Sequence, residues 1–297
     1  MPEGPVGDPP QGTGGEGTPG NIVMERRSPS PELGSIVFFE HVNLRVPEHR
    51  LATLYFIEGL GLTRDPYRMV GTRNMWVNVG NQQFHLPIGD ATPLQGEVGL
   101  VVPDLQEVES QLDHVAPALK GTSFSFEQVE GTLLTTTPWG HQIRIHPQGK
   151  LPGRLPQALA YVQFWVPPGT SAGIGAFYRD VLQCPIESEL IEGDPAVRVT
   201  VGPYQLFRFR EKKGAGIVPN NNHVAVYLTR YRSIYGTLTR MGLIMEEDDH
   251  DQFRFRSMID PDTGTLLYSF EHEMRSLHHP DYRRPLANRV PVPYRVD

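Results

Sequence analysis

Polar side chains that could bind a ligand alternate with apolar ones along several short segments of the chain. In residues 37–46, His41, Asn43 and Arg45 alternate with Val42, Leu44 and Val46, as in a strand with one polar and one apolar face. The same alternation places further polar side chains on the inner faces of other predicted strands: Gln83, Gln142 and His146. Such a stripe would be costly to bury in a dry core, so we interpret it as the lining of a ligand cavity.

The elements that carry this stripe belong to an internal repeat. The segment His41–Pro47 (HVNLRVP) returns in the second half as Tyr161–Pro167 (YVQFWVP), and each copy is followed by a helical stretch with an aromatic pair. Each copy also closes on a turn and a strand, at residues 138–144 and 262–268. A long-period repeat of this kind determines the architecture before single residues are interpreted.

Each repeat contains two copies of a smaller unit. In the first unit a strand at 37–46 precedes a helix from Glu48 to Leu60, and short strands are expected near 65–70, 74–79 and 82–87. The unit recurs from Gly96, with a helix at 104–119, and two more units begin at Ala160 and Asn222. The sequence therefore predicts an α+β protein of four βαβββ modules arranged in two pairs.

This pattern gives a domain division. The first segment is rich in Pro, Gly, Ser and acidic residues and cannot bury enough apolar surface to fold, so disorder is expected there. The predicted ranges are a disordered tail at 1–34, a first domain at 35–147, a linker at 148–156, a second domain at 157–275 and a C-terminal extension at 276–297.

Bulk properties narrow the function classes. The net charge of −7 gives no electrostatic support for a nucleic-acid partner. Apolar runs are shorter than the roughly 20 residues of a membrane span, and we expect no membrane partner. Cys184 is the single cysteine, which excludes a disulfide framework and favours a reducing, cytoplasmic location. A small-molecule substrate is the expected partner; the oligomeric state stays open.

The residues resemble the vicinal oxygen chelate superfamily, the group of glyoxalase I, extradiol dioxygenases and fosfomycin-resistance proteins. The resemblance covers 36–150 and 156–273, and rests on the opening strands, the Phe177-Tyr178 helix and the turns at Asp260–Gly264 and Pro138–Gly140. It implies that two modules curl into an open barrel. A divalent metal would lie inside, held by the first and last strands of each module.

The resemblance also implies a ligand set in the first domain. The matching positions are His41, His85, Glu97 and Arg144. Two imidazoles and one carboxylate suit one divalent Fe, Mn, Ni, Co or Zn ion. Arg144 has no lone pair to offer, so it would bind a substrate carboxylate instead, with Asn43 and Gln142 completing the catalytic set.

Two alternatives stay open at this point. Arg144 could pair with Glu97 and fill the site with a salt bridge. The protein could also be a non-catalytic small-molecule binding protein without metal, instead of a metal-dependent lyase, isomerase or dioxygenase acting on a small oxygenated, anionic molecule. In the second domain the matching positions are Tyr161, Phe207, His223 and Tyr268, which predicts a degenerate site there.

Overall fold

The computed structural model describes residue 4 and residues 32–68, 73–153, 155–248 and 251–288. The chain divides into two units, Met1–Ser30 and Pro31–Asp297, and the second contains every helix and strand that the structure describes. Most of the tail predicted at 1–34, and the end of the extension predicted at 276–297, lie outside the described residues.

Four successive modules of one strand, one helix and three strands confirm the predicted fold class. The first contains β1 (Ile36–Asn43), α1 (His49–Ala52) continuing as the π-helix η1 (Thr53–Gly59), β2 (Thr63–Arg64), β3 (Asn74–Val79) and β4 (Gln82–Pro87). The second contains β5 (Gly96–Val102), α2 (Leu105–Val115), the 3-10 helix η3 (Ala116–Leu119), β6 (Ser125–Val129), β7 (Thr132–Thr136) and β8 (Gln142–Pro147).

The second half of the chain repeats this order. The third module contains β9 (Ala158–Val166), α3 (Ser171–Ala176), the π-helix η4 (Phe177–Val181), β10 (Ile186–Ile191), β11 (Asp194–Gly202) and β12 (Gln205–Glu211). The fourth contains β13 (His223–Leu228), α4 (Tyr231–Arg240), β14 (Ile244–Asp248), β15 (Gln252–Ile259) and β16 (Leu266–Ser276). No helix within the described ranges has both the length and the apolar character to cross a lipid bilayer.

One strand lies earlier than predicted. The strand expected at 65–70 is β2, which ends at Arg64, and Met69 and Val70 lie outside the described residues. The side chain of Asp65 accepts hydrogen bonds from the backbone N–H groups of Tyr67 and Arg68, at 2.8 and 3.3 Å. An aspartate that binds the backbone two and three residues ahead favours a turn over a continued strand.

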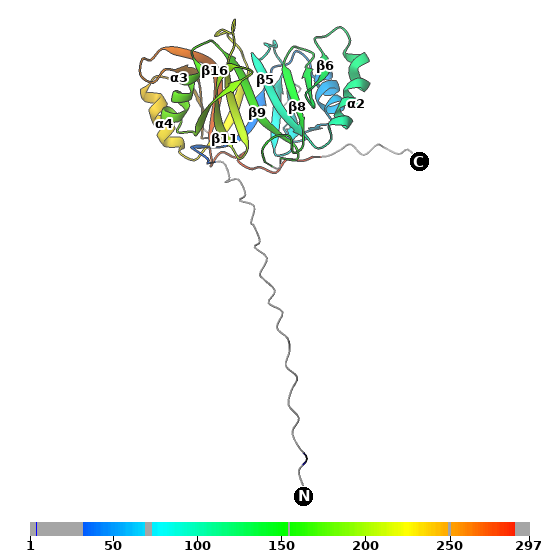
Figure 1. Cartoon of the computed structure of the whole chain (residues 1–297), viewed down its shortest axis with the longest axis horizontal. Coiled ribbons are helices and arrows are strands. Elements are labelled where there is room, and N and C mark those ends of the chain that lie inside the picture. The colour runs from blue at the N-terminus through cyan, green and yellow to red at the C-terminus, as the bar shows by residue number, and fades with distance from the viewer. Residues whose placement is uncertain (1–3, 5–31, 69–72, 154, 249–250, 289–297) are drawn as a thin grey trace. The chain divides into compact units, whose positions relative to one another are not determined.

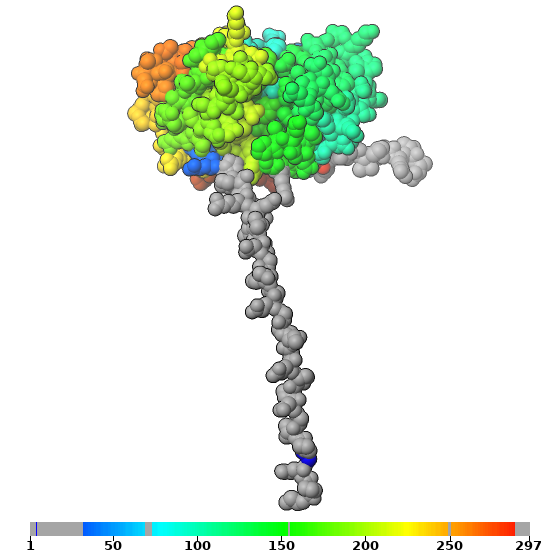
Figure 2. All heavy atoms as spheres, viewed as in Figure 1, coloured from blue at the N-terminus to red at the C-terminus, as the bar shows by residue number. Residues whose placement is uncertain are grey.

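The sheets pair the modules differently from the expectation. The first open sheet has the order β14-β15-β16-β13-β1-β4-β3-β2, so it combines modules one and four. The second, β10-β11-β12-β9-β5-β8-β7-β6, combines modules three and two; it lies toward the viewer in Figure 1, and its green residues cover much of the face seen in Figure 2. The strands of each predicted domain, 35–147 and 157–275, are thus divided between both sheets.

Modules that follow one another in the chain share a hydrophobic core instead. In the first half, Phe56 of η1 packs on Phe84 of the first sheet, while Tyr55 donates a hydrogen bond to Thr135 of the second sheet. In the second half, Phe177 of η4 packs on Phe255. Figure 1 accordingly shows α2 at one end of the sheets and α3 with α4 at the other. The apolar outer faces are buried in this way, and the polar inner faces are left to line cavities.

Two glutamine side chains join the sheets at equivalent bulges. The register shifts at each bulge, so Glu40 of β1 and Ala160 of β9 each have no paired residue on the neighbouring antiparallel strand. Gln205 accepts from the N–H of Phe39 at 3.2 Å and donates to its carbonyl at 3.1 Å. Gln82 accepts from the N–H of Leu159 at 2.9 Å and donates to its carbonyl at 3.1 Å. The amides therefore satisfy backbone groups that the bulges withdraw from the strand ladder.

Replacing Gln205 by leucine is expected to lower the free energy of unfolding by about 1–3 kcal/mol, because the buried N–H of Phe39 loses its acceptor. Urea unfolding measures the change. Gln128→Leu is the control, because this exposed side chain binds only an exposed glutamate and should change stability by less than about 0.5 kcal/mol. Equal stability of the two variants would contradict the role assigned to Gln205.

Candidate metal centre

Strand register brings three histidines from two distant parts of the chain to one inner face. Val42 of β1 faces Val224 of β13 in the antiparallel pair. His41 and His223 each precede one of these valines, so they hold equivalent positions on the two strands. On the next strand, His85 of β4 pairs with Asn43. The inner face of the first sheet therefore collects His41, His85 and His223.

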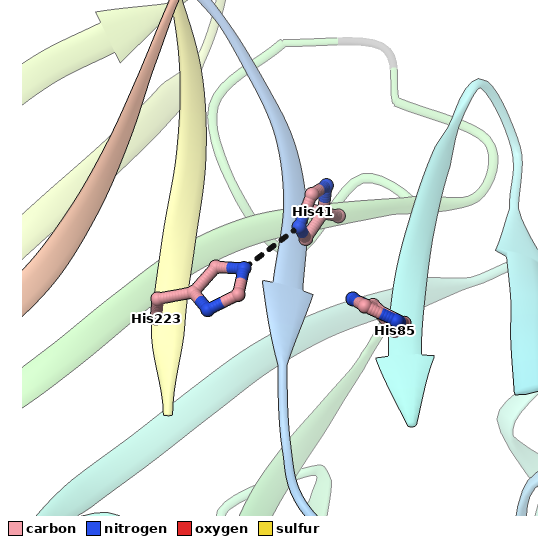
Figure 3. A group of neighbouring side chains, drawn as sticks. All are labelled: His41, His85 and His223. Atoms are coloured by element: carbon pink, nitrogen blue, oxygen red, sulfur yellow. Dashed lines mark hydrogen bonds between the residues drawn. The ribbon is translucent and has the colours of Figure 1, made fainter. Parts of the chain in front are cut away.

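The imidazole rings converge on a common space (Figure 3). Their ligand atoms all lie within 4.8 Å of one another, and the Nε2 atoms of His41 and His223 are 3.3 Å apart. His85 directs a ring nitrogen at the space between the other two. His41 is fully buried and His223 is 6% exposed. These are candidate ligands that require no rearrangement of the backbone.

Glu273 occupies the fourth equivalent position. Ala225 pairs with Glu273 of β16 in the same way as Asn43 pairs with His85. One carboxylate oxygen of Glu273 lies 3.4 Å from Nε2 of His223, and two guanidinium groups contact it: Arg254 and Arg275, each at 2.5 Å. Burial acts to raise the pKa of Glu273, but Arg275 and the other nearby cations outweigh it, and the pKa is held below its usual range. Glu273 is thus an ionised carboxylate at the edge of the histidine cluster.

Neighbouring side chains hold each imidazole. Nδ1 of His41 forms a hydrogen bond with the carboxylate of Glu40 at 2.9 Å, whereas Nδ1 of His223 lies 3.6 Å from Glu271, beyond hydrogen-bond distance. A carboxylate that accepts the Nδ1 proton fixes the tautomer whose Nε2 lone pair is free for a metal. The Glu40 side chain reaches His41 because the bulge in β1 turns it toward this face.

His85 is held by an amide and an indole. Its Nδ1 is 2.9 Å from the amide of Asn43, whose carbonyl oxygen has no hydrogen-bond partner among the described residues. The other ring nitrogen, Nε2, lies 3.3 Å from Oδ1 of Asn74. A metal bound at Nε2 would replace this contact, with the Asn43 amide turned to accept the Nδ1 proton. Trp76 stacks on the ring with centroids 3.9 Å apart. Asn43, predicted as a catalytic residue, therefore lies where it can orient His85.

The cluster fits a divalent metal. Burial lowers the pKa of His41 and of His223 well below the ordinary value, so both rings are neutral. Their Nε2 atoms form a hydrogen bond with each other, which a bound metal ion would replace. Two imidazole nitrogens on one metal, each at about 2.1 Å, would lie about 3.0–3.4 Å apart in octahedral or tetrahedral geometry. The measured 3.3 Å between His41 and His223 falls in this interval.

The other predicted site residues do not join this cluster. Glu97 and Gln142 face each other on β5 and β8 of the second sheet, and Arg144 lies two residues further along β8. Both carboxylate oxygens of Glu97 accept from Nε of Arg144 at 3.1 Å, and one accepts from the hydroxyl of Tyr161 at 2.8 Å. The salt bridge considered as an alternative is therefore present in the structure.

Register explains the difference between the two inner faces. In the second sheet Val98 faces Val162, and the positions equivalent to the histidine cluster are held by Glu97, Arg144, Tyr161 and Arg208. Two of the four are guanidinium groups, which cannot bind a metal. The same register shows why sequence reasoning missed His223 and Glu273. The sequence repeat predicts a separate, degenerate site that contains His223, and it predicts Tyr268 as the last-strand position of that site.

Tyr268 instead lies in the aromatic core, where its ring centroid is 6.0 Å from that of Phe164. Because β16 runs from Leu266 to Ser276, the position that matches His85 falls five residues later, at Glu273. The recurrence of histidine at the start of the fourth module was the one available sequence signal.

Solved structures of other proteins share the fold of this chain. Glyoxalase I from Zea mays matches with a TM-score of 0.57 at 14% identity, over 80% of this chain and 91% of that one. A protein from Bacillus subtilis, solved as a candidate dioxygenase, matches with a TM-score of 0.50 at 14% identity, over 82% and 85%. No protein-family model and no curated protein matches the sequence.

The chain has the vicinal oxygen chelate fold. This confirms the resemblance drawn from the opening strands and closing turns. Sequence identities this low show a shared fold but not a shared reaction, because proteins of one fold catalyse many different reactions. The function has to be argued from the residues of the site.

Replacing Glu40 by glutamine is expected to weaken metal binding by about 10–100-fold, because His41 loses the carboxylate that fixes its tautomer. Competition with a chromogenic chelator measures the affinity. Glu187→Gln, on an exposed surface strand, is the control. An affinity unchanged by Glu40→Gln would show that His41 needs no carboxylate partner.

Proposed function

We propose that this protein is a metal-dependent enzyme of the vicinal oxygen chelate type that acts on a small oxygenated, anionic molecule. The observation that supports it is the neutral cluster of His41, His85 and His223, with two Nε2 atoms at a spacing that suits one metal. Of the ions expected, Fe, Mn, Ni, Co and Zn all accept imidazole ligands.

The reaction that the residues favour is proton transfer, as in a lyase or isomerase. A bound divalent ion would act as a Lewis acid and make a proton next to the substrate's chelating oxygens more acidic. Glu273 is the carboxylate beside the cluster, 3.4 Å from Nε2 of His223, and this position lets it accept that proton. Arg254 and Arg275 hold its two oxygens and fix its position.

The side chains that would take part in this step line a cavity and are themselves little exposed. His41 and Glu273 are nearly inaccessible to solvent, and Trp76, 8% exposed, covers His85. A fixed carboxylate interacts more strongly with a developing charge where few water molecules surround it. Glu273 is therefore the proposed base, and Trp76 forms one wall of the site.

Elemental analysis of protein purified without a His-tag tests the proposal. About one divalent ion per chain, lost on chelator treatment, is the expected result. Fe(II) together with oxygen consumption would move the assignment to a dioxygenase, whereas a redox-inert ion would favour proton transfer. Protein that takes up no ion from a metal-supplemented solution would contradict the proposal and favour a metal-free binding protein.

A further inference from the structure

The cavity beside the histidine cluster is lined by charged side chains of both signs. It has a volume of about 520 Å³ and is lined by three arginines and three acidic residues. These six are Arg68, Arg254, Arg275, Asp248, Glu273 and Asp281. Each arginine is paired with at least one carboxylate, and two of these carboxylates, Glu40 and Glu271, are not lining residues. An anionic substrate in the cavity must therefore compete with a carboxylate of the protein for one of the arginines.

Two of the three arginines are committed to carboxylates on the strands. Arg254 contacts Glu271 at 3.0 Å and Glu273 at 2.5 Å. Arg275 contacts Glu273 at 2.5 Å and Glu40 at 2.5 Å. Releasing either would leave carboxylates buried without a partner, which is costly. They are therefore fixed parts of the wall.

Arg68 differs from the other two. It forms an ion pair with Asp281, which lies beyond the last strand, in the C-terminal segment (residues 277–288). The guanidinium lies 4.4 Å over the ring of Trp76, the side chain that stacks on His85. Arg68 is thus a cation placed next to the candidate metal ligands, and its carboxylate partner belongs to no sheet.

Asp281 can leave Arg68 without becoming an isolated charge. It also lies 3.7 Å from Arg275 and 3.8 Å from Arg284. The C-terminal segment is held by polar contacts to the first module, among them Arg284 to Asp65 at 3.1 Å and Asn288 to Thr63 at 2.7 Å, and by packing of His279 and Tyr282 on Tyr227. The Asp281 side chain can therefore change partner by rotating between staggered conformers while the segment stays in place.

We propose that Asp281 occupies the position on Arg68 at which a carboxylate of the substrate binds. The substrate is then a small dicarboxylate, with two adjacent oxygens at one end for the metal and a second carboxylate at the other end for Arg68. Arginine binds a carboxylate through two parallel hydrogen bonds, so this second group sets the orientation of the molecule. The inference rests on the proposed function, since the first end of the molecule needs the metal.

Calorimetric titration with malate and lactate tests the proposal on metal-loaded protein. Both are 2-hydroxy acids that can chelate a metal, and only malate carries the second carboxylate. Wild-type protein should bind malate more tightly than lactate. Asp281→Asn should tighten malate binding by about tenfold, if Asp281 holds Arg68 for about nine-tenths of the time, and leave lactate unchanged. Arg68→Gln should reduce malate affinity to that of lactate.

A matched control separates competition from loosening of the segment. Thr63→Val removes the contact to Asn288 but leaves Asp281 with all its arginine partners, so it should not tighten malate binding. Equal tightening by Thr63→Val and Asp281→Asn, or equal affinity of wild-type protein for malate and lactate, would overturn the proposal. Metal content measured on the same samples keeps the two questions apart: absence of metal contradicts the proposed function, whereas loaded protein that does not distinguish the two acids contradicts only the role of Arg68.

Discussion

Replacing His223 by alanine is expected to abolish stoichiometric metal binding, as is replacing His41. The two Nε2 atoms lie 3.3 Å apart and come from equivalent strands, so each variant removes one of three imidazoles from the same cluster. A site reduced to two neutral nitrogens and a carboxylate held by arginines should lose at least about 100-fold in affinity. Elemental analysis after dialysis against a metal-containing buffer measures the occupancy.

The control for this experiment comes from the other sheet. Glu97→Gln and Arg144→Gln alter polar groups on the second inner face and should leave metal content unchanged. Metal retained by His223→Ala and lost by Glu97→Gln would place the ion in the second sheet. That pattern would contradict the assignment of the cluster.

Replacing Glu97 by leucine is expected to lower the free energy of unfolding by about 3 kcal/mol. The carboxylate is 8% exposed, and its loss leaves the Arg144 guanidinium without its carboxylate and the Tyr161 hydroxyl with only Nε2 of His146, at 3.1 Å. Breaking a buried pair costs about 3–5 kcal/mol, and the lower end applies because the Arg144 side chain is 26% exposed and partly screened by water. Urea unfolding at neutral pH measures the loss.

Two further variants sharpen this prediction. Glu97→Gln keeps an oxygen that can accept from Tyr161 or Arg144, so it should cost less than leucine. A Glu97→Leu, Arg144→Leu double variant removes both charges and should recover part of the stability, since an apolar pair of similar volume avoids the unpaired guanidinium. If the two residues do not interact, the destabilisation of the double variant equals the sum of the destabilisations measured for Glu97→Leu and Arg144→Leu alone. That result would contradict the prediction.

Local patterns in the sequence were sufficient to predict the modules and half of the cluster. Alternation along residues 37–46 placed His41 and Asn43 on the polar face, and the helix and strand order that followed is the one observed. These predictions succeed because the period of two in a strand and the glycine end of a helix depend on neighbouring residues alone. His41 and His85 belong to the same module, so their proximity follows from the pairing of β1 with β4 within it.

Only the tertiary structure decided which modules share an inner face. The repeat predicts four similar units, each with an opening strand such as β1 that needs a partner, but similar units offer similar edges. In the structure β1 pairs with β13 and β5 with β9, because the helices fill the space between modules that are adjacent in the chain. This pairing brings His223 and Glu273 to His41 and His85, and brings Tyr161 to Glu97. The choice depends on packing between residues nearly two hundred positions apart, which no local pattern in the sequence encodes.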